Sequence, residues 1–284
     1  MTRIAVIGSS HVGAVRMAQS QIQALYPAVD LRFFAMTAGM FPHAFVDDAG
    51  VLQVPKSVGA RRERLMRINN AEALDLSSYE HIWIVGPRYL LHSMHRMLRN
   101  HGLFGHTKPS EGKMMLTWDF VAAAIEDMVD GAHARLAKAY GRDQRITVTP
   151  APMPSQSTLN PGDFFDRPLK HVTEMPQMER IAALYEGRIA KCTLDQGWRI
   201  LPQPQATRVA PFVTHDRYAF RPAEGDNNPL DFRHMGANYG VILARAYLSG
   251  VLGLASQPGA NDSPSQSAPT QPVPASQDAK DTSA

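Results

Sequence analysis

The chain has 284 residues, of which 44% are hydrophobic and 19% are charged, and its formal net charge is +3. This is ordinary globular composition, and the dispersed charge lacks the clustered basic face that nucleic-acid-binding proteins usually carry. The densest basic stretch, residues 60–67, favours a solvated helix face, with a landing site for an anionic substrate as the alternative. No apolar run reaches the roughly 18–20 residues of a membrane span.

The first residues resemble a strand and not a secretory signal, because they include no long apolar region and no small-residue cleavage site. Cys192 is the only cysteine, so the chain cannot form an internal disulfide. These features predict a cytoplasmic protein that neither spans a membrane nor binds nucleic acid. The oligomeric state is left open.

Strand-like and helix-like segments alternate along the chain. Apolar, β-branched or aromatic patterns predict strands at residues 3–7, 31–35, 81–85, 145–149 and 198–201. Helical spacing covers residues 11–25, 118–140, 177–194 and 239–252. Buried strands that alternate with helices predict an α/β fold, in which helices cover both faces of a parallel sheet.

The composition changes at residue 256. Residues 256–284 are rich in Pro, Ser, Gln and Ala and include no aromatic residue. Such a segment cannot bury enough apolar surface to offset the entropy lost on ordering. We therefore expect one α/β domain over residues 1–255, followed by a disordered tail.

The first predicted strand ends at a small-residue turn, GSSHVG, which suits two different chemistries. In a dinucleotide-binding fold, Gly8, Ser10 and Gly13 would occupy the glycine positions of G-x-G-x-x-G. Ser10, however, adds a Cβ where the backbone must approach the pyrophosphate. The second strand, LRFFAMTAG, also lacks the acidic residue that holds the ribose. A nicotinamide oxidoreductase is therefore the weakest interpretation, and no cofactor is expected.

In the other chemistry Ser10 is a nucleophile, which needs a base and a group that orients this base. Asp231 and His234 lie three residues apart in a predicted loop before the last helix. At that spacing Asp231 can hold the Nδ1–H of His234 from the same turn, leaving Nε2 to accept a proton from Ser10. The alternatives are a helix cap for Ser10 and structural roles for Asp231 and His234.

Two short blocks of the chain resemble the SGNH, or GDSL-type, hydrolase superfamily. Residues 8–10, Gly-Ser-Ser, are similar to its Gly-Asp-Ser block, and residues 231–234, Asp-Phe-Arg-His, to its D-x-x-H block. The resemblance implies a flavodoxin-like, three-layer α/β/α fold with five parallel strands. It also implies esterase or acyl-transfer chemistry, with Ser10 as the nucleophile, His234 as the base and Asp231 as the residue that orients it.

Two positions depart from the family's pattern. Ser9 replaces the aspartate of the first block, and Arg88 stands where a third block, G-x-N-D, has an asparagine that donates to the oxyanion. Arg88 can donate to an oxyanion itself, bind a carboxylate or phosphate of the substrate, or face water at a helix start. Gly39 fits the family's second oxyanion donor by position, unless it is only a turn glycine, and the N–H of Ser10 is the third.

The favoured function is therefore a serine esterase or acyltransferase that acts on a small-molecule or glycan ester. The missing asparagine motivates an alternative, a binding module that holds an acidic or acylated glycan without turnover. His92 and His95 share a predicted helix, but no third ligand accompanies them, so no metal site is expected. Residues 153–175, which are turn-rich, are the expected place for substrate selectivity.

Overall fold

The computed structural model describes residues 1–105, 114–159, 170, 172–175, 177–221 and 231–257, with only the backbone described at positions 231 and 232. Five parallel strands form a central sheet in the order β10-β9-β6-β1-β2. They are β1 (Thr2–Gly8), β2 (Val29–Ala35), β6 (His81–Val85), β9 (Ile146–Thr149) and β10 (Arg199–Ile200). The predicted α/β fold with a five-stranded parallel sheet is confirmed.

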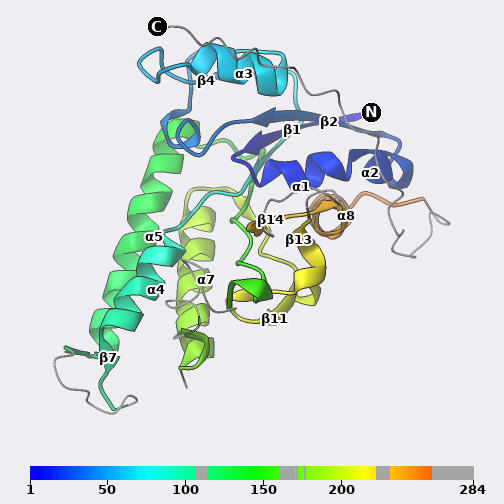
Figure 1. Cartoon of the computed structure of the whole chain (residues 1–284). Helices are drawn as coiled ribbons and strands as arrows, with labels where there is room; N and C mark the ends of the chain where they lie inside the picture. Colours follow the sequence, from blue (N-terminus) through cyan, green and yellow to red (C-terminus); the bar gives the residue numbers. More distant parts are fainter. Residues whose placement is uncertain (106–113, 160–169, 171, 176, 222–230, 258–284) are drawn as a thin grey trace, which may run out of the picture.

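Helices cover both faces of this sheet, so the fold has three layers (Figure 1). Side chains of β1 alternate between the two faces, as the two-residue period of a strand requires. Ile4 and Val6 join one hydrophobic cluster, whereas Ala5 and Ile7 join the other. The first cluster includes side chains of α1 (Val12–Met17), α2 (Gln19–Leu25) and α8 (Ala237–Arg245). The second includes side chains of α3 (Arg61–Asn69), α4 (Leu91–Asn100), α5 (Trp118–Tyr140) and α7 (Met178–Asp195).

Shorter elements fill the connections between these layers. A three-stranded antiparallel sheet consists of β3 (Phe45–Val46), β4 (Val51–Gln53) and β5 (Leu74–Asp75). Three two-stranded pairs are β7 (Gly102–Leu103) with β8 (Met115–Leu116), β11 (Arg208–Ala210) with β12 (Val213–Thr214), and β13 (Ala219–Phe220) with β14 (Asp231–Met235). Single helical turns are η1 (Phe41–His43), η2 (Gln156–Leu159), η3 (Gln205–Thr207) and η4 (Asp216–Tyr218).

Two predicted helices differ from the structure. The helix expected at residues 11–25 is divided into α1 and α2 at Ala18, whose N–H is shared between the carbonyl oxygens of Ala14 and Val15. The closing helix changes from α-helical to π-helical hydrogen bonding at η5 (Ala246–Val251). In both places the chain remains helical, but the hydrogen-bond spacing changes.

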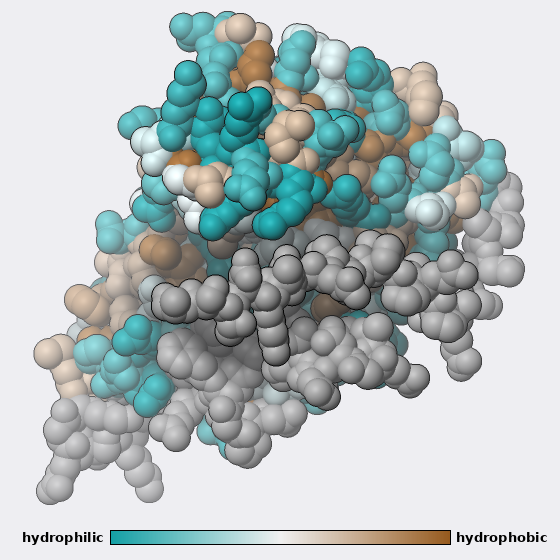
Figure 2. Space-filling view, turned by 45° about the horizontal axis from the view of Figure 1, so that its top comes forward, coloured by the Kyte–Doolittle hydropathy of each residue, from teal (hydrophilic) through white to brown (hydrophobic). Residues whose placement is uncertain are grey.

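The basic stretch at residues 60–67 lies on α3. Its arginines Arg62, Arg64 and Arg67 are exposed, whereas Leu65 between them is fully buried. Figure 2 brings the α3 end of the molecule forward and shows hydrophilic side chains gathered over it. This stretch is the solvated helix face that its composition predicts.

The last described residues run back along α2, where the N–H of Gln257 donates to the carbonyl oxygen of Leu25 at 2.9 Å. Residues 258–284, which make up most of the predicted tail, lie outside the described residues. Among the helices that the structure describes, none is both long enough and apolar enough to cross a membrane.

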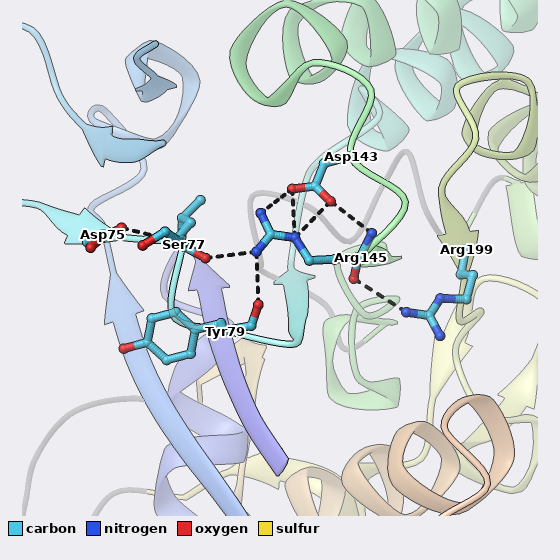
Figure 3. Close-up of polar contacts among 7 residues, drawn as sticks. Asp75, Ser77, Tyr79, Asp143, Arg145 and Arg199 are labelled. Carbon is cyan, nitrogen blue, oxygen red and sulfur yellow. Dashed lines mark hydrogen bonds and ion pairs between the residues drawn. The ribbon is translucent and has the colours of Figure 1, made fainter. Parts of the chain in front are cut away.

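Arg145 joins the amino-terminal ends of the central strands (Figure 3). Its guanidinium donates to the carbonyl oxygens of Leu76 and Tyr79, each at 2.9 Å, and so holds the loop that leads into β6. The same guanidinium makes paired contacts with the carboxylate of Asp143, including one of 2.6 Å. Arg199 on β10 donates to the carbonyl oxygen of Arg145 at 3.4 Å. The side chain and the backbone carbonyl of Arg145 thus connect the starts of β6, β9 and β10, at the edge opposite the carboxyl ends of the strands.

The pKa of Asp143 makes this contact sensitive to acid. Burial acts to raise the pKa of this carboxyl, but hydrogen bonds from Arg145 outweigh burial and hold it below the ordinary value. Asp143 therefore stabilises the fold above the pKa of the unfolded chain, and this contribution is lost as the pH falls through the folded pKa.

We expect the free energy of unfolding of Asp143→Asn, measured with urea, to fall less steeply between about pH 5 and about pH 2 than that of the wild type. The matched control is Asp127→Asn on α5, an exposed carboxylate in no ion pair with any described residue. The free energy of unfolding of this control should change with pH as steeply as that of the wild type. Equal slopes for Asp143→Asn and the wild type would contradict the assignment.

Candidate active site

The site begins where β1 ends. A Cβ at Gly8 would lie 1.9 Å from the carbonyl oxygen of Val85, so only glycine lets β1 and β6 approach this closely. The next residue, Ser9, is buried and donates from Oγ to the carbonyl oxygen of Gly86 at 3.3 Å. Ser10 follows and is exposed. The turn therefore fixes one serine inside the fold and presents the other at the carboxyl edge of the sheet.

Ser10 Oγ lies 2.6 Å from Nε2 of His234, although the two residues are 224 positions apart in the chain. His234 is on β14, directly before α8. The alternative role of Ser10 as a helix cap does not apply, because His11 holds the N-cap position of α1 and no side chain makes a capping hydrogen bond there. A hydroxyl within hydrogen-bond reach of an imidazole nitrogen is the geometry that proton transfer between them requires.

Asp231 was expected to share a turn with His234, and this local prediction is wrong. Residues 231–235 form β14, because pairing with β13 holds their backbone extended; Asp231 pairs with Phe220 and Met235 with Ala219. The side chain of Asp231 and residues 222–230 lie outside the described residues. The role of Asp231 as the residue that orients His234 stays a prediction.

His11 packs against His234 on the inner side of the site. The ring centroids of His11 and His234 lie 5.3 Å apart at an interplanar angle of 43°, and His11 is buried. Gly86 makes room for it: a Cβ on Gly86 would come within 2.6 Å of Cβ of His11, and Gly86 has a φ of +85°. The sequence does not predict this contact, because the two residues lie far apart in the chain and no local pattern links them.

Two cavities flank the turn that carries Ser10. The larger, of about 310 Å³, is lined by His11, and the smaller, of about 210 Å³, is lined by Ser9. Pro87, Arg88 and Leu90 line both. Ser10 and His234 line neither cavity themselves, but their chain neighbours Ser9, His11 and Arg233 do.

Arg88 follows β6 and is exposed, but its neighbours remove part of the solvent around its guanidinium. This loss of solvent, together with the positive charge of Arg233, lowers the pKa of Arg88 from its ordinary value. Arg88 makes no ion pair with any residue that the structure describes. It is thus a cation beside the candidate site, close to a second cation on β14.

Gly39 lies exposed in the turn after β2. It lines neither cavity, whereas its neighbour Ala38 lines the smaller one. Among the described residues, no acceptor takes the backbone N–H of Gly39 or that of Ser10. The oxyanion roles of the Gly39 and Ser10 N–H groups stay predictions.

His92 and His95 lie on α4 and both line the larger cavity. His95 is buried edge-on against Phe212, and burial, with a smaller effect of His92, lowers its pKa to about 3. Within the described part of the chain, no group of three or more His, Cys, Asp or Glu side chains is placed to hold a metal ion.

The segment expected to give selectivity is only partly described. Met153 and Pro154 line the larger cavity, and the carbonyl oxygen of Pro154 accepts from the N–H of Thr214 at 2.8 Å. Residues 160–169, 171 and 176 lie outside the described residues.

Comparison with known proteins found no matching family model and no matching curated protein. Among solved structures, an extracellular lipase from Streptomyces rimosus has a TM-score of 0.36 and 13% identity, covering 86% of this chain and 98% of the lipase. A protein from Lactobacillus plantarum has a TM-score of 0.34 and 14% identity, covering 89% of this chain and 97% of its own. At these scores the likeness carries no conclusion about the activity of this chain.

The helices that follow Ser10 and His234 touch through their backbones. A Cβ on Gly240 of α8 would lie 2.0 Å from the carbonyl oxygen of Ala14 on α1. The closeness of α1 and α8 therefore depends on a glycine at this position.

We expect Gly240→Ala to lower the free energy of unfolding by about 1–3 kcal/mol, because the added methyl group forces the two helices apart. Gly250→Ala is the matched control, since a Cβ at Gly250 meets no atom within 4 Å. Urea unfolding followed by circular dichroism measures both. Equal stability of the two variants would contradict the role assigned to Gly240.

Proposed function

We propose that the protein is a serine-dependent ester hydrolase or acyltransferase. The observation that carries this proposal is the distance of 2.6 Å between Ser10 Oγ and His234 Nε2. It is supported by the location of the pair at the carboxyl edge of a parallel sheet, where ligands bind in open α/β folds.

In this mechanism Ser10 Oγ attacks the ester carbonyl carbon while His234 Nε2 accepts the hydroxyl proton. The carbonyl oxygen becomes an oxyanion, which the N–H groups of Ser10 and Gly39 stabilise. The intermediate then collapses: the bond to the alcohol oxygen breaks, and His234 gives its proton to this leaving group. An acyl ester of Ser10 remains.

The second half repeats these steps with another nucleophile. His234 removes a proton from water or from a hydroxyl of a second substrate, and the resulting oxygen attacks the acyl carbon. Collapse returns the proton to Ser10 and releases a carboxylic acid or a new ester. Asp231 accepts the Nδ1–H of His234 and stabilises the imidazolium that forms in each half.

A binding module without turnover is the second candidate function, since Arg88 stands where the resemblance expects an asparagine amide. The two functions differ in the reactivity of Ser10. A fluorophosphonate probe reacts with an activated serine and leaves an unactivated one unmodified.

We expect the probe to label the wild type at Ser10 and to leave Ser10→Ala unlabelled, with the modified peptide identified by mass spectrometry. Ser9→Ala is the matched control, because the Ser9 hydroxyl is buried and donates to Gly86; its Ser10 should still be labelled. An unlabelled wild type, or labelling at another residue, would overturn the esterase proposal and favour the binding module.

Replacement of His234 by Gln should lower kcat/KM for a short acyl ester by about 100- to 10,000-fold, the usual contribution of a general base. His43→Gln is the matched control: His43 is exposed and lines neither cavity. A steady-state assay with p-nitrophenyl acetate measures both. Full activity in His234→Gln would remove His234 from the mechanism.

A further inference from the structure

The larger cavity beside the Ser10–His234 pair has a mainly apolar lining. Its volume of about 310 Å³ is at the low end of the range for small-molecule sites, about 300–1,000 Å³. The apolar lining includes Pro87, Tyr89, Leu91, Met153, Ile189 and Pro202. Such walls favour an apolar chain, because they supply few partners for the hydroxyl groups of a sugar.

Gln203, which carries the amide group of the lining, is already engaged. Its Nε2 donates to the hydroxyls of Thr207 and Thr214 at 3.0 and 2.9 Å, and its Oε1 accepts from the N–H of Met153 at 2.8 Å. It therefore fixes the cavity wall instead of offering hydrogen bonds to a ligand.

The charged side chains of the lining are predominantly positive. Among the described lining residues, Glu186 is the one carboxylate, and its Oε1 lies 2.5 Å from Nη1 of Arg208, whose side chain is 7% exposed. Beyond that ion pair the lining includes two further guanidinium groups, Arg88 and Arg233, and both residues are exposed. The apolar cavity thus has two cations at its solvent-facing side.

These two cations are also close to the reacting pair. Arg233 directly precedes His234 on β14, and Arg88 follows Gly86, which packs against His11. Both residues line the same cavity, and the charge of Arg233 adds to the effect of lost solvent in lowering the pKa of Arg88. An anion bound between them would accept charge-assisted hydrogen bonds from both guanidinium groups.

We propose that the site binds a single-chain anionic amphiphile. The apolar chain lies in the larger cavity, and a phosphate or carboxylate group lies between Arg88 and Arg233. The placement of an ester of this amphiphile at Ser10 rests on the function proposed above, whereas the binding itself does not. In this arrangement Arg88 holds the substrate anion and is not the replacement for the oxyanion-hole asparagine.

The test is calorimetric binding to full-length Ser10→Ala, which cannot turn over the ligand, with butyl, hexyl and octyl phosphate. Affinity should rise by about fourfold for each added methylene that the cavity buries. Octanoate binding, measured in the same way, shows whether a carboxylate can occupy the anion site in place of a phosphate. Affinity that does not depend on chain length would overturn the assignment of the cavity.

The anion site is tested by adding Arg88→Met or Arg233→Met to Ser10→Ala. Each should weaken octyl phosphate binding by about tenfold or more, the usual loss for a charge-assisted hydrogen bond, and leave the binding of neutral 1-octanol unchanged. Arg142→Met is the matched control, because Arg142 is exposed and lines neither cavity. An equal effect of Arg142→Met, or tighter binding of octyl glucoside than of octyl phosphate, would overturn the anion site.

The cavity is tested independently by a blocking variant. Ala190 lines the cavity from α7, whereas Ala183 on the same helix is exposed. Ala190→Phe should abolish the dependence on chain length, and Ala183→Phe should preserve it. If the binding pattern holds but the fluorophosphonate probe leaves Ser10 unlabelled, the ligand class stands and the esterase proposal fails. If Ser10 is labelled but binding does not depend on chain length or on the two arginines, the esterase proposal stands and the ligand class fails.

Discussion

The backbone contact between α1 and α8 is the constraint on which the candidate site depends. Ser10 lies directly before His11, the N-cap of α1, and His234 lies just before α8, so the distance between their side chains is set by how these helices pack. Gly240 lets α8 approach the carbonyl oxygen of Ala14 without a methyl group between them. The sheet fixes the position of Ser10, because Gly8 lets the end of β1 lie directly against the backbone of Val85 on β6. Two glycines, 232 positions apart in the sequence, thus bring a hydroxyl to an imidazole.

Features that follow from local signals are predictable from the sequence. The long helix α5 has the predicted bounds, because Thr117 caps its start by accepting from the N–H of Phe120 and Gly141 ends it at a φ of +64°. By contrast, β14 is extended only because it pairs with β13, a partner more than ten residues away that no local pattern reveals. Secondary structure that depends on such a partner is decided by tertiary contacts and not by intrinsic preference.

The candidate site, too, could be predicted from the sequence only in part. The closeness of Ser10 and His234 was expected from the positions of two motifs, one at the end of the first strand and the other between the fifth strand and the closing helix. The contact between His11 and Gly86, and the larger cavity itself, did not follow. The lining of that cavity comes from several separate stretches of the chain, and Arg233 joins it only through the path of β14. No single stretch of sequence encodes such a surface.

The amino and carboxyl ends of the central strands have different roles in this protein. The amino edge is held by the Arg145 guanidinium, which faces carbonyl oxygens and one carboxylate, while the carboxyl edge presents Ser10, His234 and the cavities. Selection for a more stable start of the strands, as at Arg145, can therefore act on a residue that contacts neither Ser10 nor His234.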